Sequence, residues 1–203
     1  MIAPQPLIID IETAPHRSAE YHEYFPKSKK KPGIHAIISE VVAIGLVDGM
    51  RPTVISQGLG QAIEEKTDPC GLTDTEHNLL TWLASVLKEH KNDPLIGFKH
   101  KSFDLPLLQL RAAKYGIKLE IPDRHSKRII DIYEVLGGKW QGDVSSCSLS
   151  ELGWFLYGQP KQSSGADVAE MWWAGDIAGI RAHCLEDILL TSKIYQDFLG
   201  VLW

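Results

Sequence analysis

A run of five residues near the start of the chain, Leu7-Ile8-Ile9-Asp10-Ile11, constrains the fold more than any other segment. An aliphatic, β-branched run of this length is typical of a short strand that is buried on both faces. Successive side chains of a strand point to opposite faces, so Asp10 and Glu12 point the same way. Two neighbouring carboxylates that lose their hydration repel each other, which is costly unless a partner compensates.

Two explanations of this pair remain open at the level of the strand itself. The strand contains no Lys or Arg, and a bound divalent cation would neutralise both carboxylates. Mg²⁺ or Mn²⁺, which prefer oxygen ligands, suit such a pair best. Alternatively, one carboxylate caps the turn that follows at Thr13-Ala14-Pro15.

The composition limits the class of protein. With 203 residues, 44% of them hydrophobic, the chain is large enough for one substantial core, and we expect a single domain over residues 1–203. The net charge of −5 argues against a protein held on nucleic acid by bulk positive charge. It does not exclude a nucleic-acid enzyme, because cations bound to carboxylates attract phosphate.

The cysteines and the hydropathy pattern predict a cytoplasmic protein. Cys70, Cys147 and Cys184 are scattered and odd in number, which indicates reduced thiols and neither a disulfide framework nor a zinc site. The N-terminus lacks a basic region before its short apolar run, and no apolar stretch approaches the length of a membrane span. We therefore expect no signal peptide and no membrane association.

Hydrophobic periodicity and turn residues predict an α/β fold, a mixed five-stranded sheet flanked by helices. Asp48-Gly49 marks a hairpin between two of the strands. Capping boxes at Thr73–Glu76 and Ser148–Glu151 predict two helix starts. The expected strands are 7–11, 37–47, 51–56, 94–98 and 128–132, and the expected helices are 76–87, 103–115, 149–158, 166–174 and 177–199.

Further acidic residues fall where such a sheet places its sites, near the carboxyl ends of strands. Asp104 follows the strand at 94–98 and begins a helix, where the helix dipole favours a carboxylate. A simple helix cap is the alternative for Asp104. Asp131 ends the strand at 128–132 and is a further candidate.

The last predicted helix carries His183 and Asp187, four residues apart and therefore on one face. Its neighbours Ile180, Leu190 and Ile194 mark that face as partly apolar, so Asp187 is expected to point toward the sheet. His183 is then placed to accept a proton near neutral pH. A surface pair is the alternative, since the spacing alone is common.

Together these motifs resemble the DEDD superfamily of 3′→5′ exonucleases, which have a ribonuclease H-like fold. The similarity runs from Ile8 to about Leu199. Within the superfamily, the chain is most similar to the branch related to the proofreading domain of family B DNA polymerases. The resemblance rests on Asp10-Ile11-Glu12, Gly97-Phe98 with Phe103-Asp104-Leu105-Pro106, Leu149-Ser150-Glu151-Leu152 and His183-Cys184-Leu185-Glu186-Asp187.

The resemblance implies a two-metal phosphodiesterase. Asp10, Glu12, Asp104 and Asp187 would hold two Mg²⁺ or Mn²⁺ ions, with Asp10 bridging them. His183 would take the proton of the attacking water. His183 stands four residues before the last Asp, which is the spacing of superfamily members that use Tyr, so a helix shift or a bridging water is expected.

The substrate would be a single-stranded nucleic acid with a free 3′ end, DNA in preference to RNA, and the products nucleoside 5′-monophosphates. Lys99 is expected to contact phosphate and Phe103 to wedge against the terminal base, and Thr13 and Ile11 are further candidate substrate contacts. Lys161 and Ser164 are candidates to line the groove for the strand. One of the adjacent Trp172 and Trp173 is expected in the core. His100 and His125 lack partners at ligand spacing and are expected at the surface.

Two other functions fit the same fold class. A catalytically silent ribonuclease H-like module, binding nucleic acid or a protein, would have lost a carboxylate, and all four are present. A ribonuclease H-like endonuclease would use the same metals without needing a 3′ end, and the His-x-x-x-Asp helix weighs against it.

Overall fold

The structure is a computed structural model that describes residues 5–16, 37–58, 70–73, 75–138, 147–159, 161 and 164–199. For residues 70–73, 137–138 and 199 it describes the backbone only.

A six-stranded sheet with strand order β4-β3-β2-β1-β5-β6 forms the centre of the fold. β1 runs antiparallel to β2, and β2 to β3, whereas the pairs β1–β5, β3–β4 and β5–β6 are parallel. The predicted mixed sheet is thereby confirmed, and a sixth strand, β4, joins the edge beyond β3. The strands are β1 (Leu7–Pro15), β2 (Ser39–Asp48), β3 (Arg51–Gln57), β4 (Cys70–Thr73), β5 (Leu95–Gly97) and β6 (Ile129–Asp131).

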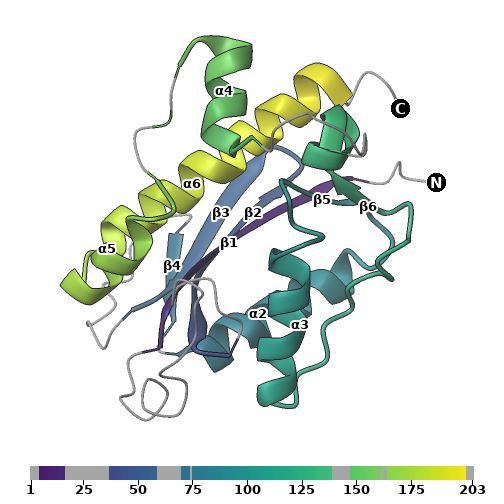
Figure 1. The fold of residues 1–203 in the computed structure, drawn as a ribbon. Helices are drawn as coiled ribbons and strands as arrows, with labels where there is room; N and C mark the ends of the chain where they lie inside the picture. Colours follow the sequence, from purple (N-terminus) through teal and green to yellow (C-terminus); the bar gives the residue numbers. More distant parts are fainter. Residues whose placement is uncertain are drawn as a thin grey trace.

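Helices cover both faces of the sheet, which makes a three-layer α/β arrangement (Figure 1). The helices α4 (Leu149–Tyr157), α5 (Val168–Ala174) and α6 (Ile177–Ile194) lie on one face. On the other face lie α2 (Glu76–Glu89) and α3 (Asp104–Lys114). Short π-helical segments, η2 (Glu134–Gly138) and η3 (Tyr195–Leu199), follow β6 and α6.

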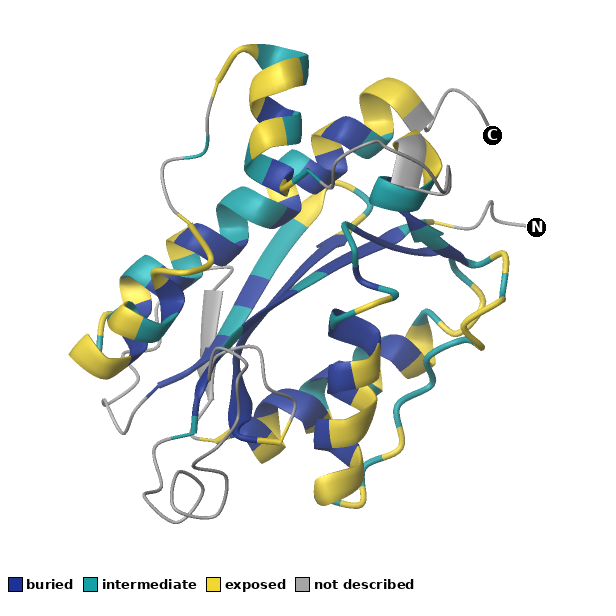
Figure 2. Cartoon of the chain, viewed as in Figure 1, coloured by how far each residue is buried: buried dark blue, intermediate teal, exposed yellow. Residues whose placement is uncertain are grey.

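Alternation along β1 divides its side chains between two cores. Ile8 and Ala14 pack with α5 and α6, whereas Leu7, Ile9 and Ile11 pack with α2 and α3. Both faces of the strand are therefore buried, as the dark central strands of Figure 2 show. Asp10 and Glu12 share the parity of Ile8, so their side chains lie on the α6 face.

Gly45 lets α6 approach the sheet closely beside Asp10. The residue pairs with Asp10 across the β1–β2 ladder, so any side chain at position 45 would lie next to that carboxylate. A Cβ atom added to Gly45 would lie 2.6 Å from Cγ2 of Ile188 and 2.8 Å from Sγ of Cys184. The absence of a side chain therefore sets how deeply α6 packs and which of its residues reach β1.

The helix starts confirm one predicted capping box and correct the other. Ser148 and Glu151 form the expected reciprocal box at the start of α4, and Gly158 ends that helix with φ of 70°. At α2 the cap is Thr75, whose side chain accepts a hydrogen bond from the Asn78 N–H at 3.2 Å. The predicted box at Thr73 is wrong, because Thr73 ends β4.

Glu76 does not act as a cap residue. Its side chain lies in the core between α2 and α3. Its carboxylate accepts hydrogen bonds from Arg111 Nε at 2.7 Å, the Tyr115 hydroxyl at 2.8 Å and the Val41 N–H at 2.8 Å. Glu76 and Arg111 are each 3% exposed. The pair therefore ties two helices to β2 on the face away from Asp10.

Candidate active site

The acidic pair of β1 lies where α6 crosses the sheet. Glu12 is buried and Asp10 is half-buried. The ladder between β1 and β2 shifts register between Glu12 and Thr13, an irregularity that re-aims side chains at a strand end. Both carboxylates consequently face one helix, α6, near the carboxyl end of the strand.

α6 presents His183 and Asp187 to this pair, on one face as their spacing predicts. Nε2 of His183 lies 3.5 Å from Oε1 of Glu12 and 3.8 Å from Oδ2 of Asp187. The imidazole is 2% exposed. Residues from the two ends of the sequence thus meet in one buried polar cluster.

Asp104 enters from the opposite side of β1, because β5 is shorter than its neighbour. β5 ends at Gly97, and the N–H of Leu7 still donates to the Pro94 carbonyl near the beginning of the ladder. Ile11 has the same parity as Leu7, and its N–H, left without a strand partner, donates to Oδ1 of Asp104 at 3.3 Å. The first turn of α3 therefore supplies a carboxylate to the open edge of β1.

The four carboxylates perturb one another. Burial raises the pKa of Asp10 well above its ordinary value, and the charges of Glu12, Asp104 and Asp187 raise it further. The pKa of Glu12 is raised by burial and by Asp187. Burial lifts the pKa of Asp104 to about 7, against the lowering effect of the backbone donors. Within the described residues, these groups hold more negative charge in close proximity than the side chains around them neutralise.

Lys161 is the cation that faces this cluster. Its ammonium group pairs with Oδ1 of Asp187, and its charge also lowers the pKa values of Asp10 and Glu12. The side chain is 6% exposed. The sequence indicated Lys161 only as a candidate groove residue. The residues around it do not show that it lies next to Asp187 of α6.

His183 and Cys184 complete the inner wall of the cluster. Burial lowers the pKa of His183 although the charge of Asp187 raises it, so the ring is held neutral. Burial and the neighbouring carboxylates raise the pKa of the Cys184 thiol well above its ordinary value. Cys184 was predicted only as a reduced thiol, and it is a free cysteine beside Asp10 and Glu12.

Two groups of side chains in this cluster have ligand atoms close enough to share a metal ion. Asp10, Glu12 and Cys184 form one group, and Glu12, His183 and Asp187 form the other, with ligand atoms within 4.8 Å of one another in each. Glu12 belongs to both. Carboxylate oxygens dominate the donor set, and such a set suits Mg²⁺ or Mn²⁺.

The candidate substrate contacts lie around the cluster in different settings. Ile11 is buried and contributes its backbone N–H to Asp104. Thr13 follows the register shift of β1 and is half-buried. Phe103 precedes α3 and packs partly into the core with α2 and α3. These three positions lie next to the acids along the chain.

The side chain of Lys99 lies against Cys147 and Tyr133. Its ammonium group donates to the Cys147 carbonyl at 2.5 Å and lies 4.5 Å from the centre of the Tyr133 ring. Its backbone has φ of 58°, in the left-handed region that a residue with a side chain rarely adopts. The predicted phosphate contact would require this side chain to leave the Cys147 carbonyl.

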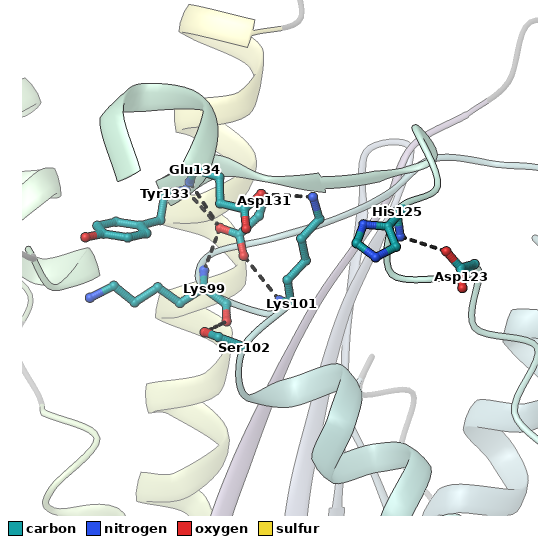
Figure 3. Close-up of polar contacts among 8 residues, drawn as sticks. All are labelled: Lys99, Lys101, Ser102, Asp123, His125, Asp131, Tyr133 and Glu134. Carbon is teal, nitrogen blue, oxygen red and sulfur yellow. Dashed lines mark hydrogen bonds and ion pairs between the residues drawn. The ribbon is translucent and has the colours of Figure 1, made fainter. Parts of the chain in front are cut away.

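Asp131 holds the loop that leads to Asp104. Its carboxylate accepts hydrogen bonds from the backbone N–H groups of Lys99 at 3.0 Å, Lys101 at 3.2 Å and Tyr133 at 3.1 Å (Figure 3). Both oxygens of the carboxylate therefore accept hydrogen bonds from the backbone. Its negative charge contributes to the raised pKa of Asp104. Asp131 positions the loop and lies at its base.

A pocket of about 440 Å³ opens beside Asp187. Lys161 and Ser164, the predicted groove residues, both line it, together with Ser148 and Ser150 at the beginning of α4. The pocket is therefore walled by hydroxyl groups and by the cation that faces the acids.

Three further predictions concern single aromatic side chains. His100 was expected at the surface, and this is wrong: it is 0% exposed, and burial lowers its pKa to about 3. The ring packs against Gly97, where a Cβ would lie 2.5 Å from Nδ1. His125 is exposed, as predicted. Trp172 is 1% exposed and Trp173 53%, which confirms that one of the pair lies in the core.

A sequence profile of predicted 3′-5′ exonucleases related to the exonuclease domain of PolB matches residues 36–200. The chain belongs to this family. The matched region contains Asp104, His183 and Asp187 and begins after Asp10 and Glu12. The family and its ribonuclease H-like α/β fold agree with the resemblance drawn from the four motifs.

Two relatives are DNA polymerases of archaea. The DNA polymerase of Pyrococcus glycovorans is 25% identical over 146 residues, which cover 63% of this chain and 19% of the polymerase. That of Pyrococcus horikoshii is 24% identical over 144 residues, covering 63% of this chain and 12% of the polymerase. The chain therefore spans less than a fifth of the length of each polymerase.

Within the described residues, no helix has both the length and the apolar character needed to cross a membrane.

Proposed function

We propose that this protein is a metal-dependent 3′-5′ exonuclease that hydrolyses phosphodiester bonds at single-stranded 3′ ends and releases nucleoside 5′-monophosphates. One observation carries the proposal. Carboxylates from β1, α3 and α6 meet in one buried cluster where their charges raise one another's pKa values. A fold does not retain such mutual repulsion for stability, because well-packed apolar residues would serve better.

The residues of the cluster fit a pair of divalent cations. Asp10, Glu12 and Asp187 would hold the ion on the side of the attacking water, and Asp104 with Asp10 would hold the second. Their oxygen donors favour Mg²⁺ or Mn²⁺ over softer metals. When bound, such ions lower the pKa of a coordinated water and stabilise the charge that develops on the leaving oxygen.

His183 acts as the proton acceptor for the attacking water. Burial lowers the pKa of its imidazole, which favours the neutral form that can accept a proton from water. Nε2 already lies within 3.8 Å of carboxylate oxygens from both β1 and α6. These carboxylates stabilise the imidazolium that forms. The close packing of α6 at Gly45 supports this role, because it brings the helix near β1.

The pocket beside Asp187 accepts the terminal nucleotide. Its serine hydroxyls and Lys161 offer donors to a phosphate and a sugar, and Phe103 borders the acids from the α3 side. Lys161 neutralises Asp187 in the free protein and can turn toward phosphate when substrate enters. A site of this size admits one nucleotide at a time, which favours a single-stranded end.

DNA is the preferred substrate in this proposal, because the relatives of known name are DNA polymerases. The extent of the domain, residues 1–203, and a cytoplasmic location stay predictions.

The test is a gel assay with 5′-labelled single-stranded DNA and RNA in Mg²⁺, Mn²⁺ or chelator. A ladder that shortens from the 3′ end, only with a divalent ion, is the expected result. Asp10→Asn protein is the control for contaminating nucleases. A circular single strand must remain intact, since its cleavage would indicate an endonuclease. If linear DNA is bound but never shortened, the chain is a silent binding module.

A further inference from the structure

A second pocket lies along β6, the edge strand of the sheet on the side of β5. It has a volume of about 340 Å³, at the lower end of the range for small-ligand sites. Ile129, Ile130 and Val135 are its aliphatic lining residues, with Ile129 packed in the α2–α3 core and Ile130 against the α6 core. The rim carries Lys101, His125 and Lys127.

The acidic groups of this pocket already have partners. Glu134 pairs with Lys101, with Nζ 2.9 Å from Oε2, and Asp131 accepts backbone N–H groups. Figure 3 shows Lys101 and His125 on one side of Asp131, whereas Lys99 extends to the other. Lys127 is exposed, and within the described part of the chain it has no ion-pair partner. Among the described residues that line the pocket, the ammonium group of Lys127 is therefore the charge that is exposed and not held in an ion pair.

This positive charge is concentrated in one segment of an acidic protein. Residues 99–128 contain eight lysines and arginines against three acidic residues, although the whole chain has 21 basic and 26 acidic residues. The segment begins at the loop before Asp104 and ends at the turn before β6. Two of these basic residues are already paired, Arg111 with the buried Glu76 and Lys101 with Glu134.

We propose that the β6 pocket holds a nucleotide of the substrate strand on the 5′ side of the scissile bond. Its phosphate lies on Lys127 and His125, and its sugar and base lie against Ile130 and Val135. β6 is two strands from β1, or about 10 Å at the usual spacing. At the stacked rise of about 3.4 Å per nucleotide, the pocket holds the third or fourth nucleotide from the end. This inference rests on the proposed function for the direction of the strand.

Binding tests the pocket independently of hydrolysis. Fluorescence anisotropy of 5′-labelled dT12 is measured in chelator, with wild-type protein and with Lys127→Glu, over a range of NaCl concentrations. We expect the Kd to rise about tenfold at low salt and the slope of log Kd against log salt to fall by about 0.7, the value for one lost contact on a single strand. Lys127→Arg should restore the wild-type Kd and the wild-type salt slope.

Lys114→Glu is the matched control. It makes the same charge change at the last residue of α3, about 15 Å along the helix from Asp104. We expect its affinity and salt slope to equal those of the wild type. If Lys127→Glu behaves as Lys114→Glu does, or if the wild type does not bind dT12, the proposal is overturned.

Hydrolysis separates this proposal from the function on which it rests. The p-nitrophenyl ester of thymidine 5′-monophosphate has no upstream strand and cannot reach the β6 pocket. We expect Lys127→Glu to hydrolyse it at the wild-type rate and to lose about tenfold in kcat/KM on dT12 only. A wild type inactive on both substrates refutes the proposed function, while the anisotropy result still decides the pocket.

Discussion

Buried carboxylates occur on both faces of the sheet, and the two groups are compensated to different degrees. On the α2–α3 face, Glu76 has a guanidinium, a phenol hydroxyl and a backbone N–H directed at it. Beside β1, the carboxylates of Asp10, Glu12, Asp104 and Asp187 have near them, among the described residues, only Lys161 and a histidine whose pKa burial lowers. The first arrangement is complete in itself and stabilises the fold. The second has an excess of negative charge, which is what a cation site requires.

Asp10→Asn should produce the largest effect on activity. Removal of one central carboxylate should lower the rate of metal-dependent hydrolysis by about a thousandfold or more. Because the substitution also relieves repulsion with Glu12 and Asp104, the Tm in chelator should stay equal or rise. Hydrolysis assays and thermal melts on the same preparation check both. If the Tm instead falls as much as it does when a buried core residue is substituted, Asp10 stabilises the fold as Glu76 does.

Glu76→Gln should give the opposite pair of results. Breaking a buried pair from one side leaves Arg111 uncompensated and should cost about 3 to 5 kcal/mol of stability, or roughly 10 °C in Tm for a chain of this length. Hydrolysis per folded molecule should remain near the wild-type rate below the transition. The double variant Glu76→Gln, Arg111→Met should regain part of the stability. A large decrease in kcat under conditions where the variant is fully folded would contradict the assignment of Glu76 to stability and of the acid cluster to catalysis.

His183→Ala should slow hydrolysis by roughly a hundredfold, the contribution of a positioned general base. The rate profile against pH should also lose its rising limb, which a purely structural histidine would not affect. His183→Tyr is the companion variant, since the four-residue spacing suits Tyr. A His183→Ala enzyme of near-normal rate would show that another group accepts the proton.

A pH-dependent stability in the metal-free protein should be the smallest effect. The pKa of Asp104 is raised from 3.8 to about 7 in the folded protein, so the folded state binds this proton more tightly than the unfolded chain does. Its contribution is fully favourable below about pH 4 and is lost as the pH rises toward 7. The Tm in chelator should therefore fall between pH 5 and pH 8 relative to that of Asp104→Asn.

Mg²⁺ should reverse this trend, because a cation binds the ionised carboxylates. At pH 8 it should raise the Tm of the wild type more than that of Asp104→Asn. Equal melting curves for the two proteins at all pH values, with and without Mg²⁺, would indicate that Asp104 is not part of the acid cluster.

The sequence predicted the elements that periodicity and caps encode locally. The aliphatic run at β1, the hairpin at Asp48-Gly49 and the capping box of α4 are all present. β4 was missed because its four residues are too short for a recognisable alternation. The box at Thr73 was wrong because Thr73 belongs to β4, while Glu76 pairs with Arg111, 35 residues away. At Glu76 a contact with a distant residue is therefore present in place of the local capping motif.

By itself the sequence predicted which residues would carry the proposed chemistry. Alternation fixed that Asp10 and Glu12 share a face, and helical spacing fixed that His183 and Asp187 share another. Only the tertiary structure decided that these two faces meet, through the missing side chain of Gly45, that Asp104 reaches the uncovered edge of β1, and that Lys161 lies against Asp187. The physical reason is that periodicity orients side chains within one element, whereas packing between distant elements sets which charges come within reach of one another.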